Sequence, residues 1–245
     1  MGVTEESSAK KKALRRRILS EVSALPPPFR READSAIRQR VLALPEYRQA
    51  RTLFLFLGVG WEIDTFPLVE EAKAAGKAVA VPRCLGHGIM EAVRLDNPEA
   101  LRSVPPLGLW EPPPGGEVLA PETLDFILVP CVACDTSGYR LGQGGGYYDR
   151  FLGALNARPP LASSVLFASS VPFTSPAPSA AFTAAVCREA QILSAVPRGS
   201  YDLPVQAVIT EARLLRPGAP KGSGICGGIH NNTQDNNQDT IENDD

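Results

Sequence analysis

The fold class is decided by two apolar stretches, TLFLFL at 52–57 and AVAVP at 78–82. Between them a helix is expected, because Thr65 can cap its start and Gly76 can end it. A continuous apolar run of this length is typical of a strand that is buried on both faces. Strand, helix and strand in this order predict a βαβ unit, in which the two strands lie parallel in one sheet.

The same alternation continues through the middle of the chain. It predicts an α/β fold with a mostly parallel open sheet, covered by helices to give three layers. We expect one domain over residues 1–216. The further elements are a short strand at 90–93, a helix at 96–102, a buried strand at 124–130, a helix from Tyr147 and a last strand at 205–210.

A basic helical hairpin is predicted at the N-terminus. Apolar residues recur at helical spacing over 8–24. Three prolines at 26–28 stop this helix, and a second one is expected to begin near Phe29.

Two stretches do not fit this body. Residues 163–185 contain six Ser, six Ala and three Pro but no charged residue, a composition that predicts a disordered insertion. Residues 231–245 contain eleven Asn, Asp or Gln, so we expect a disordered acidic tail over 217–245. Neither stretch is expected to contribute to the core.

Composition and charge exclude several classes of protein. The 245 residues carry a formal net charge of −2, whereas a nucleic-acid-binding protein usually has a large excess of basic residues. No apolar run fits a membrane span and no secretory signal opens the chain, so a cytoplasmic location is predicted. The Arg-rich residues 10–17 leave an organelle as the alternative. The five cysteines are expected to be reduced, with Cys131 and Cys134 as buried, inert thiols, because no second pair completes a zinc site.

A glycine-rich loop lies between the last long apolar strand and the helix from Tyr147. Its glycines at 142 and 144–146 allow successive backbone N–H groups to converge on an anion, and the helix N-terminus adds partial positive charge. Arg140 adds a planar pair of donors for the same oxygens. A dinucleotide fingerprint would need glycine in place of Tyr147, and a Walker A ending is absent. The residues alone leave two interpretations, a phosphate cradle and a tight turn.

The sequence RLGQGGGYYDRFL at 140–152 resembles the signature of the 5-formyltetrahydrofolate cyclo-ligases, a family also called methenyltetrahydrofolate synthetases. The chain departs from this family at Gln143, where a tyrosine or a basic residue is usual, and at the insertion over 163–185. The similarity extends to KKALR at 11–15, EIDT at 62–65, PR at 82–83, WEP at 110–112 and the region 191–211.

The resemblance implies ATP-driven closure of 5-formyltetrahydrofolate to 5,10-methenyltetrahydrofolate, with release of ADP and phosphate. The formyl oxygen would attack the γ-phosphoryl group, and N10 would then displace phosphate from the activated carbon. Such chemistry depends mainly on positioning and charge stabilisation. Mg²⁺ is the expected cofactor, ATP and the folate are the expected partners, and a monomer is expected.

The resemblance also assigns residues to roles. The groups expected to act in catalysis are Tyr147 and Arg140. The expected ATP contacts are Lys11, Arg15, Arg140, Gly142, Gly144, Gly145, Gly146, Tyr147 and Tyr148. The expected folate contacts are Leu57, Glu62, Trp110, Gln143, Gly144, Gly145, Gly146 and Tyr147. The expected Mg²⁺ ligands are Asp149 and Asp202.

Each assignment has an ordinary structural alternative. Lys11 and Arg15, four residues apart, present two cations on one helical face, which without the resemblance would be a solvated basic surface. Trp110 would be a packing residue and Asp149 a carboxylate that stabilises the start of its helix. Two other functions also stay open. One is a non-catalytic folate- or nucleotide-binding relative, and the other is a dinucleotide-dependent oxidoreductase, which Tyr147 disfavours.

Overall fold

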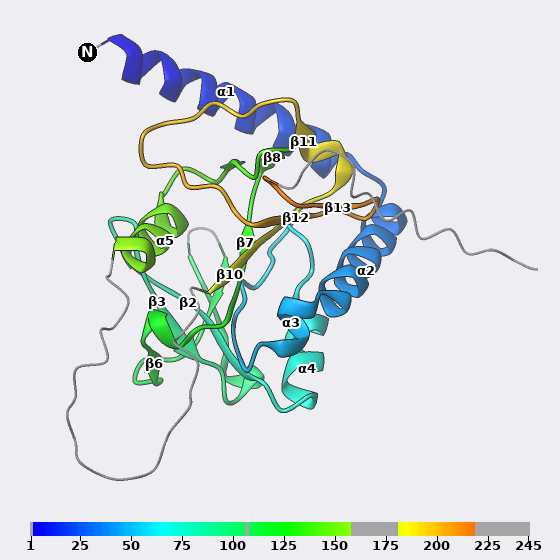
Figure 1. The fold of residues 1–245 in the computed structure, drawn as a ribbon, viewed down its shortest axis with the longest axis vertical. Helices are drawn as coiled ribbons and strands as arrows, with labels where there is room; N and C mark the ends of the chain where they lie inside the picture. Colours follow the sequence, from blue (N-terminus) through cyan, green and yellow to red (C-terminus); the bar gives the residue numbers. More distant parts are fainter. Residues whose placement is uncertain (1, 106–107, 158–180, 219–245) are drawn as a thin grey trace, which may run out of the picture.

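The computed structural model describes residues 2–105, 108–157 and 181–218 (Figure 1). Eight strands form one sheet in the order β13-β12-β10-β7-β1-β2-β3-β6. The five strands from β12 to β2 are parallel, and β13, β3 and β6 are antiparallel to their neighbours. These strands are β1 (Thr52–Phe54), β2 (Ala78–Gly86), β3 (Ile89–Arg94), β6 (Val118–Leu119), β7 (Phe126–Pro130), β10 (Phe182–Val186), β12 (Ala207–Ile209) and β13 (Leu214–Leu215).

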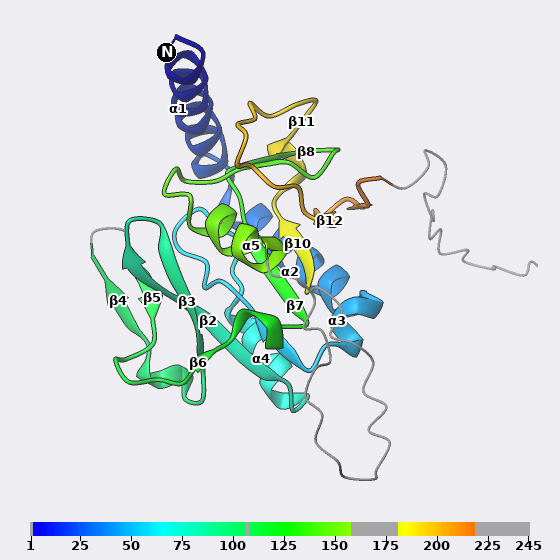
Figure 2. The same cartoon turned by 60° about the vertical axis from the view of Figure 1, so that its left-hand side comes forward.

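Helices cover both faces of this sheet, which confirms the predicted three layers (Figure 2). Leu53 and Leu55 pack on the face covered by α2 (Pro27–Ala43), α3 (Pro45–Gln49) and α4 (Phe66–Ala74). Phe54 packs on the opposite face, against α5 (Tyr147–Ala157). Alternate residues of one strand are thus buried on opposite faces, as expected of a strand between two helical layers.

The two N-terminal helices are present, and they pack on different parts of the molecule. The first, α1 (Gly2–Ser23), buries Ile18 and Val22 against a small sheet of β11 (Ile192–Leu193), β8 (Ala133–Asp135) and β9 (Arg140–Leu141). The second, α2, packs on the large sheet. In Figures 1 and 2, α1 extends outward while α2 runs along the body. This placement brings the apolar side of α1 to the small sheet and Arg15 to the end of β9.

Two predicted elements need correction. The helix expected at 96–102 is only a 3₁₀ turn, η1 (Pro98–Ala100), because the following β4 (Arg102–Val104) pairs with β5 (Leu109–Glu111). The predicted insertion ends too late, since Phe182–Val186 is a central strand between β7 and β12. Residues 163–180 and 219–245 lie outside the described residues.

The predicted strands at 78–82, 90–93, 124–130 and 205–210 are confirmed with shifted ends, and the predicted helix begins at Tyr147 as expected. The strand predicted at 52–57 is shorter, since β1 ends at Phe54. The remaining two short 3₁₀ turns are η2 (Pro121–Thr123) and η3 (Glu189–Gln191). In the described part of the chain, no helix has the length and apolar character to cross a membrane.

Candidate functional site

The glycine-rich loop joins β9 to α5 and leaves its backbone donors open. Gly144 has φ +106° and Gly146 has φ +69°, backbone angles that residues other than glycine rarely adopt. Within the described residues, the N–H groups of 144–146 donate to no protein acceptor. The first turn of α5 follows directly, and its N-terminal dipole favours a negative ligand. The loop therefore has the properties of an anion site.

Of the two predicted α1 cations, Arg15 contacts this loop and Lys11 contacts the segment around Asp202. Arg15 donates from Nε to the Gly142 carbonyl at 2.7 Å, and its guanidinium lies 3.4 Å from where a Cβ on Gly144 would stand. Lys11 donates from Nζ to Asp202 at 2.5 Å. The loop is thus bordered by the positive charge of Arg15, which lies more than 120 residues away in the sequence.

Arg140 lies differently from its expected position. Its side chain is only 3% exposed, and it donates from Nη1 to the Leu203 carbonyl at 2.6 Å and from Nη2 to Asp149 at 2.8 Å. The planar pair of donors expected to hold phosphate is therefore occupied within the protein. Arg140 ties the first turn of α5 to the chain around Leu203 and thereby supports the loop from inside.

The two carboxylates expected to bind Mg²⁺ are brought to the same region. Asp149 pairs with Arg140, and Asp202 directly precedes Leu203, which accepts from that same arginine. Each carboxylate uses one oxygen in its ion pair, through Oδ1 of Asp149 and Oδ2 of Asp202. Among the described residues no cluster of three potential ligands is present. Two carboxylates still fit Mg²⁺, which usually takes one or two together with phosphates and water.

Glu62 connects the loop after β1 to the glycine-rich loop. Its Oε1 accepts from the Gln143 side chain at 2.9 Å, and its Oε2 accepts from the Val59 N–H at 3.0 Å. Burial raises the pKa of the Glu62 carboxyl above its usual value, although these two hydrogen bonds oppose the rise. Glu62 and Gln143, both expected to contact the folate, therefore meet directly and join the acid to the anion loop.

Thr65 corrects a local prediction in the same loop. It stands at the start of α4, but its hydroxyl makes no capping hydrogen bond to the helix. The hydroxyl donates to the Phe56 carbonyl at 2.6 Å and accepts from the Gly58 N–H at 3.1 Å. Thr65 thus holds the chain that leads from β1 to Glu62.

The two tyrosines at the start of α5 point to different surroundings. The ring of Tyr147 lies against the loop, 2.6 Å from where a Cβ on Gly145 would stand. Tyr148 packs on Phe54, with ring centroids 6.2 Å apart, and its buried hydroxyl has no protein partner. Burial, with Glu62 and Cys84 nearby, raises the pKa of Tyr148. Tyr148 was expected near the nucleotide, yet it lies inside the protein on the Glu62 side.

The remaining folate candidates differ in exposure. Leu57 is 4% exposed and belongs to the core beneath the loop, so the surface expected to meet the pterin is covered. Trp110 on β5 is 37% exposed and meets the ring of Phe66 edge-on at 5.9 Å. Trp110 is therefore available to a ligand, whereas Leu57 supports the site from below.

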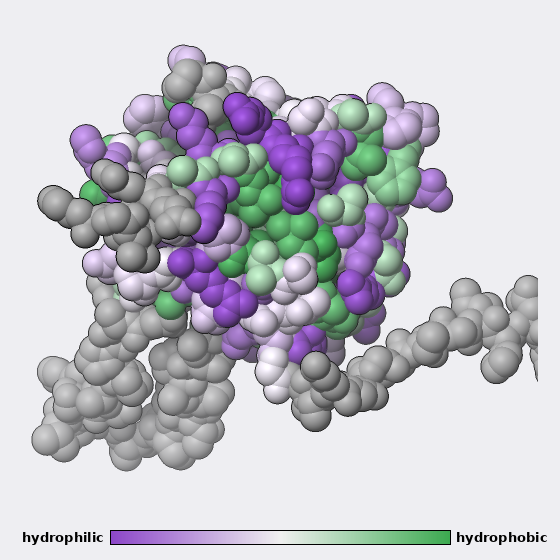
Figure 3. All heavy atoms as spheres, turned by 90° about the horizontal axis from the view of Figure 1, so that it is seen from above, coloured by the Kyte–Doolittle hydropathy of each residue, from purple (hydrophilic) through white to green (hydrophobic). Residues whose placement is uncertain are grey.

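A shallow pocket lies beside Glu62, past the carboxyl ends of β1, β7 and β10, where ligands of open α/β sheets usually bind. On the side of the molecule that carries α1 and the small sheet, hydrophobic surface gathers in the middle and hydrophilic residues border it (Figure 3). The pocket is lined by Phe56, Trp61, Glu62, Ile63, Pro130, Cys131, Val186 and Gln191.

The thiols near this pocket are confirmed as buried. Cys131 is 5% exposed and Cys134 is fully buried, and both are unoxidised. Contact with Cys131, together with burial, raises the pKa of the Cys134 thiol, which keeps it in its unreactive neutral form.

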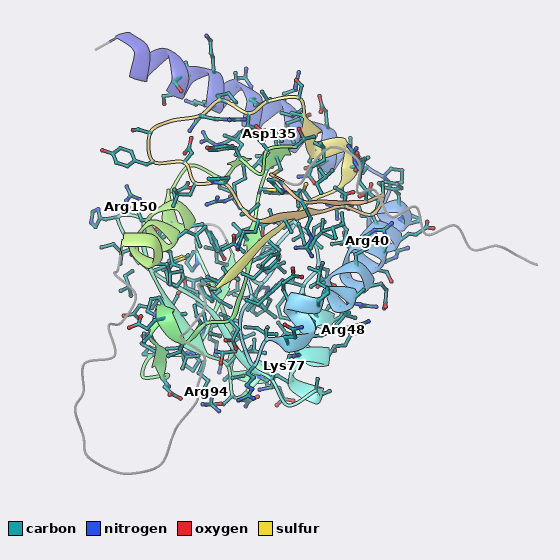
Figure 4. All side chains as sticks on the ribbon, in the orientation of Figure 1. Arg40, Arg48, Lys77, Arg94, Asp135 and Arg150 are labelled. Carbon is teal, nitrogen blue, oxygen red and sulfur yellow. The ribbon has the colours of Figure 1, made fainter. Side chains whose placement is uncertain are left out.

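Two functional neighbours were missed from the sequence. Arg188 is 1% exposed and holds the loop around Glu62 by donating to the Trp61 carbonyl and to Asp34. Arg150 lies in the first turn of α5 (Figure 4) and donates to the Gly145 carbonyl at 2.8 Å. Arg150 stands within the quoted signature, so the motif itself contained this signal. Arg188 gave none, because a lone arginine in sequence does not indicate burial.

The sequence and the fold are similar to those of one known family. The model of the "5-formyltetrahydrofolate cyclo-ligase family" matches residues 7–211. A 5-formyltetrahydrofolate cyclo-ligase of Escherichia coli is 34% identical over 131 residues, covering 53% of this chain and 72% of that protein. The mouse protein of the same name is 29% identical over 148 residues, covering 58% and 73%. A solved structure, the 5,10-methenyltetrahydrofolate synthetase of Aquifex aeolicus, is 28% identical with a TM-score of 0.67, covering 90% of this chain and 99% of that one.

Proposed function

Because the chain belongs to the 5-formyltetrahydrofolate cyclo-ligase family, we propose that its glycine-rich loop holds the triphosphate of ATP beside bound 5-formyltetrahydrofolate. The chain catalyses the ATP-dependent closure of this folate to 5,10-methenyltetrahydrofolate. The observation that supports the ATP site most strongly is the set of N–H groups at 144–146, which have no acceptor among the described residues and are bordered by Arg15. Donors fixed in advance stabilise phosphoryl charge without reorganisation during the reaction.

The reaction needs an activated formyl carbon. The formyl oxygen attacks the γ-phosphorus of ATP, the bond from this phosphorus to the bridging oxygen breaks, and ADP leaves. The N10 amine then attacks the formyl carbon and loses its proton. The carbon–oxygen bond breaks with phosphate as the leaving group, which gives the methenyl cation, ADP and phosphate. No oxidant or protein nucleophile is required, in agreement with a site made of cations, amides and one buried acid.

The residues divide this work. The amides of the loop and the cations Arg15 and Lys11 bind the phosphates, and Tyr147 lies beside the reacting end. Glu62 orients the folate ring, since its carboxylate is held by hydrogen bonds at the edge of the loop. Arg140 keeps Asp149 in place. We assign to Arg140 a supporting role in ATP binding through that contact.

Mg²⁺ would be held by Asp149 and Asp202 together with phosphate oxygens. This ion would neutralise charge on the transferred phosphoryl group. Both carboxylates already pair with cations, so the chain keeps them in position with Lys11 and Arg140. A cytoplasmic location and a monomeric state stay predictions from the sequence.

The direct test is an assay with purified protein, 5-formyltetrahydrofolate, ATP and Mg²⁺. We expect the near-ultraviolet absorbance of the methenyl product to appear and to depend on ATP. Binding of both ligands without product at high enzyme concentration would instead identify a non-catalytic relative. An enzyme whose ATP affinity is unchanged in Arg15→Ala would contradict the phosphate site proposed here.

A further inference from the structure

The turn between β2 and β3 lies against the glycine-rich loop. It consists of Gly86, His87 and Gly88, all with positive φ, at +88°, +50° and +76°. His87 is the one described residue other than glycine that adopts such an angle. A non-glycine residue in this conformation persists only where its surroundings hold it. Its neighbour Gly88 is where the turn meets the loop.

Arg150 fills the space between the turn and the loop. A Cβ added to Gly88 would stand 1.6 Å from Nη1 of Arg150 and 2.7 Å from the Gly145 carbonyl oxygen. A Cβ on Gly146 would stand 2.8 Å from the same nitrogen. The guanidinium therefore occupies a gap that exists because both neighbouring positions are glycine.

The loop is consequently held from two sides through its carbonyl groups. Arg15 donates to the Gly142 carbonyl, and Arg150 donates to the Gly145 carbonyl. Charge-assisted hydrogen bonds of this kind are stronger than neutral ones. With the carbonyl groups turned to the arginines, the amides at 144–146 stay free for a ligand.

We propose that Arg150 and Gly88 are positioning residues for ATP, and that the β2–β3 turn sets the conformation of the phosphate loop. This inference rests on the proposed function, in which that loop binds the triphosphate. Neither residue is required to touch ATP. Arg150 acts through the Gly145 carbonyl, and Gly88 acts by leaving room for Arg150.

The turn contains its own control. Gly86 has a positive φ like Gly88, but a Cβ added to Gly86 would meet nothing within 4 Å. Alanine at either position therefore strains the backbone in a similar way, whereas only alanine at Gly88 displaces Arg150. A difference between the two variants measures the contact and not the strain.

The experiment measures KM for ATP and for 5-formyltetrahydrofolate in Gly88→Ala and Gly86→Ala. We expect Gly88→Ala to raise KM for ATP by about 10- to 100-fold, with a smaller change for the folate, since small displacements of a positioning group have effects of this size. Gly86→Ala should stay within about twofold of the parent. Equal effects of the two substitutions on KM for ATP would overturn the inference.

A double-mutant cycle tests the route of the effect. In an Arg150→Met background, Gly88→Ala should raise KM for ATP less than it does in the parent, because the guanidinium is gone and only the close approach to the Gly145 carbonyl oxygen remains. Fully additive effects would overturn the inference. Arg150→Lys, which keeps a cation able to donate to the Gly145 carbonyl, should recover part of the loss.

A ligand-free measurement separates this inference from the proposed function. Amide hydrogen exchange over 142–150 should be faster in Gly88→Ala than in Gly86→Ala, with no nucleotide present. Unchanged exchange would reject the coupling even in an active enzyme. If exchange is faster in Gly88→Ala but the parent protein shows no turnover, the coupling is retained and the proposed reaction is rejected.

Discussion

Two loops meet at the candidate site, and they are built in opposite ways. The loop after β1, residues 55–65, is closed on itself: Thr65 bridges Phe56 and Gly58, and Glu62 accepts from Val59. The glycine-rich loop leaves its amides unpaired and is held from outside by two arginines. A side-chain hydrogen bond from Gln143 to Glu62 joins the two loops.

This difference shows how one site can combine an acid with a binding site for an anion. A buried carboxylate must keep its hydrogen bonds before the substrate arrives, because an unpartnered one is costly. An anion receptor needs the reverse, donors that stay free until phosphate binds. The first loop should therefore contribute to stability, and the second mainly to ATP affinity.

The largest expected effect comes from removing the anchor of the first loop. Arg188 is fully buried and donates to the Trp61 carbonyl and to Asp34, which itself accepts from the Asp64 N–H. Arg188→Met leaves the half-buried Asp34 carboxylate without its ion pair and should lower the free energy of unfolding by about 3 kcal/mol. Urea denaturation measures this change.

An exposed pair nearby supplies the control for Arg188. Arg213 pairs with Glu189 at 2.6 Å, but its side chain is 50% exposed. Arg213→Met should therefore cost no more than about 1 kcal/mol. Similar losses in the two variants would show that the first loop is not specially anchored.

The next largest effect tests the second loop. Arg15→Ala removes a charge-assisted contact that contributes about 1.5–3 kcal/mol, so KM for ATP should rise about 10- to 100-fold. The free energy of unfolding should change much less than in Arg188→Met, because the loop is not part of the core. A large loss of stability with unchanged KM for ATP would reverse the comparison. Isothermal titration with a non-hydrolysable ATP analogue gives an independent value for the affinity.

The contrast between the loops was only partly predictable from the sequence. Lys11 and Arg15 could be placed on one helical face by their spacing, and the structure turns this face to the loop. The orientation of Tyr148 could not be predicted, because adjacent residues at a helix start point in different directions and only packing decides which is buried. That of Arg140 depends on its contacts with Leu203 and Asp149, which the sequence does not reveal. The Arg150 contact depends on Gly88, more than 50 residues away in the sequence.

The fold shows the same division between local and long-range information. The β1, α4 and β2 unit was predictable because its apolar runs are continuous and its helix has a clear start and end. The strand β10 was missed since FTAAV follows a Ser-, Ala- and Pro-rich stretch and has little apolar signal of its own. It becomes a central strand only through pairing with β7 and β12. Local propensity could not show that pairing.

The raised pKa of the Glu62 carboxyl distinguishes this acid from an exposed one and should make catalysis depend on pH. The charged carboxylate is the form expected to orient the folate. Catalysis should therefore fall as the pH drops through that pKa, by up to about tenfold per pH unit below it. Glu62→Gln should be less active and should lack this acid limb in kcat/KM for the folate. An identical acid limb in Glu62→Gln would assign the titration to another group.

The stability of the same protein should respond in the opposite direction. A carboxyl whose pKa is raised on folding binds more protons in the folded state than in the unfolded chain. Its contribution to stability is therefore greatest below its unfolded pKa and is lost as the pH rises through its folded pKa. The difference in unfolding free energy between the parent and Glu62→Gln should follow this trend. A difference that does not vary with pH would mean that Glu62 is ionised equally in both states.

The smallest expected effect concerns a cation on the same helix as Arg15. Arg17 is 60% exposed and pairs with Glu21 at 3.6 Å, one helical turn away. Such pairs contribute about 0.3–0.5 kcal/mol, so Arg17→Ala should barely change the stability or KM for ATP. If Arg17→Ala and Arg15→Ala raised KM for ATP equally, the general positive charge of α1 would be responsible. A change confined to Arg15→Ala would instead mean that the contact with Gly142 distinguishes a binding residue from a solvated one.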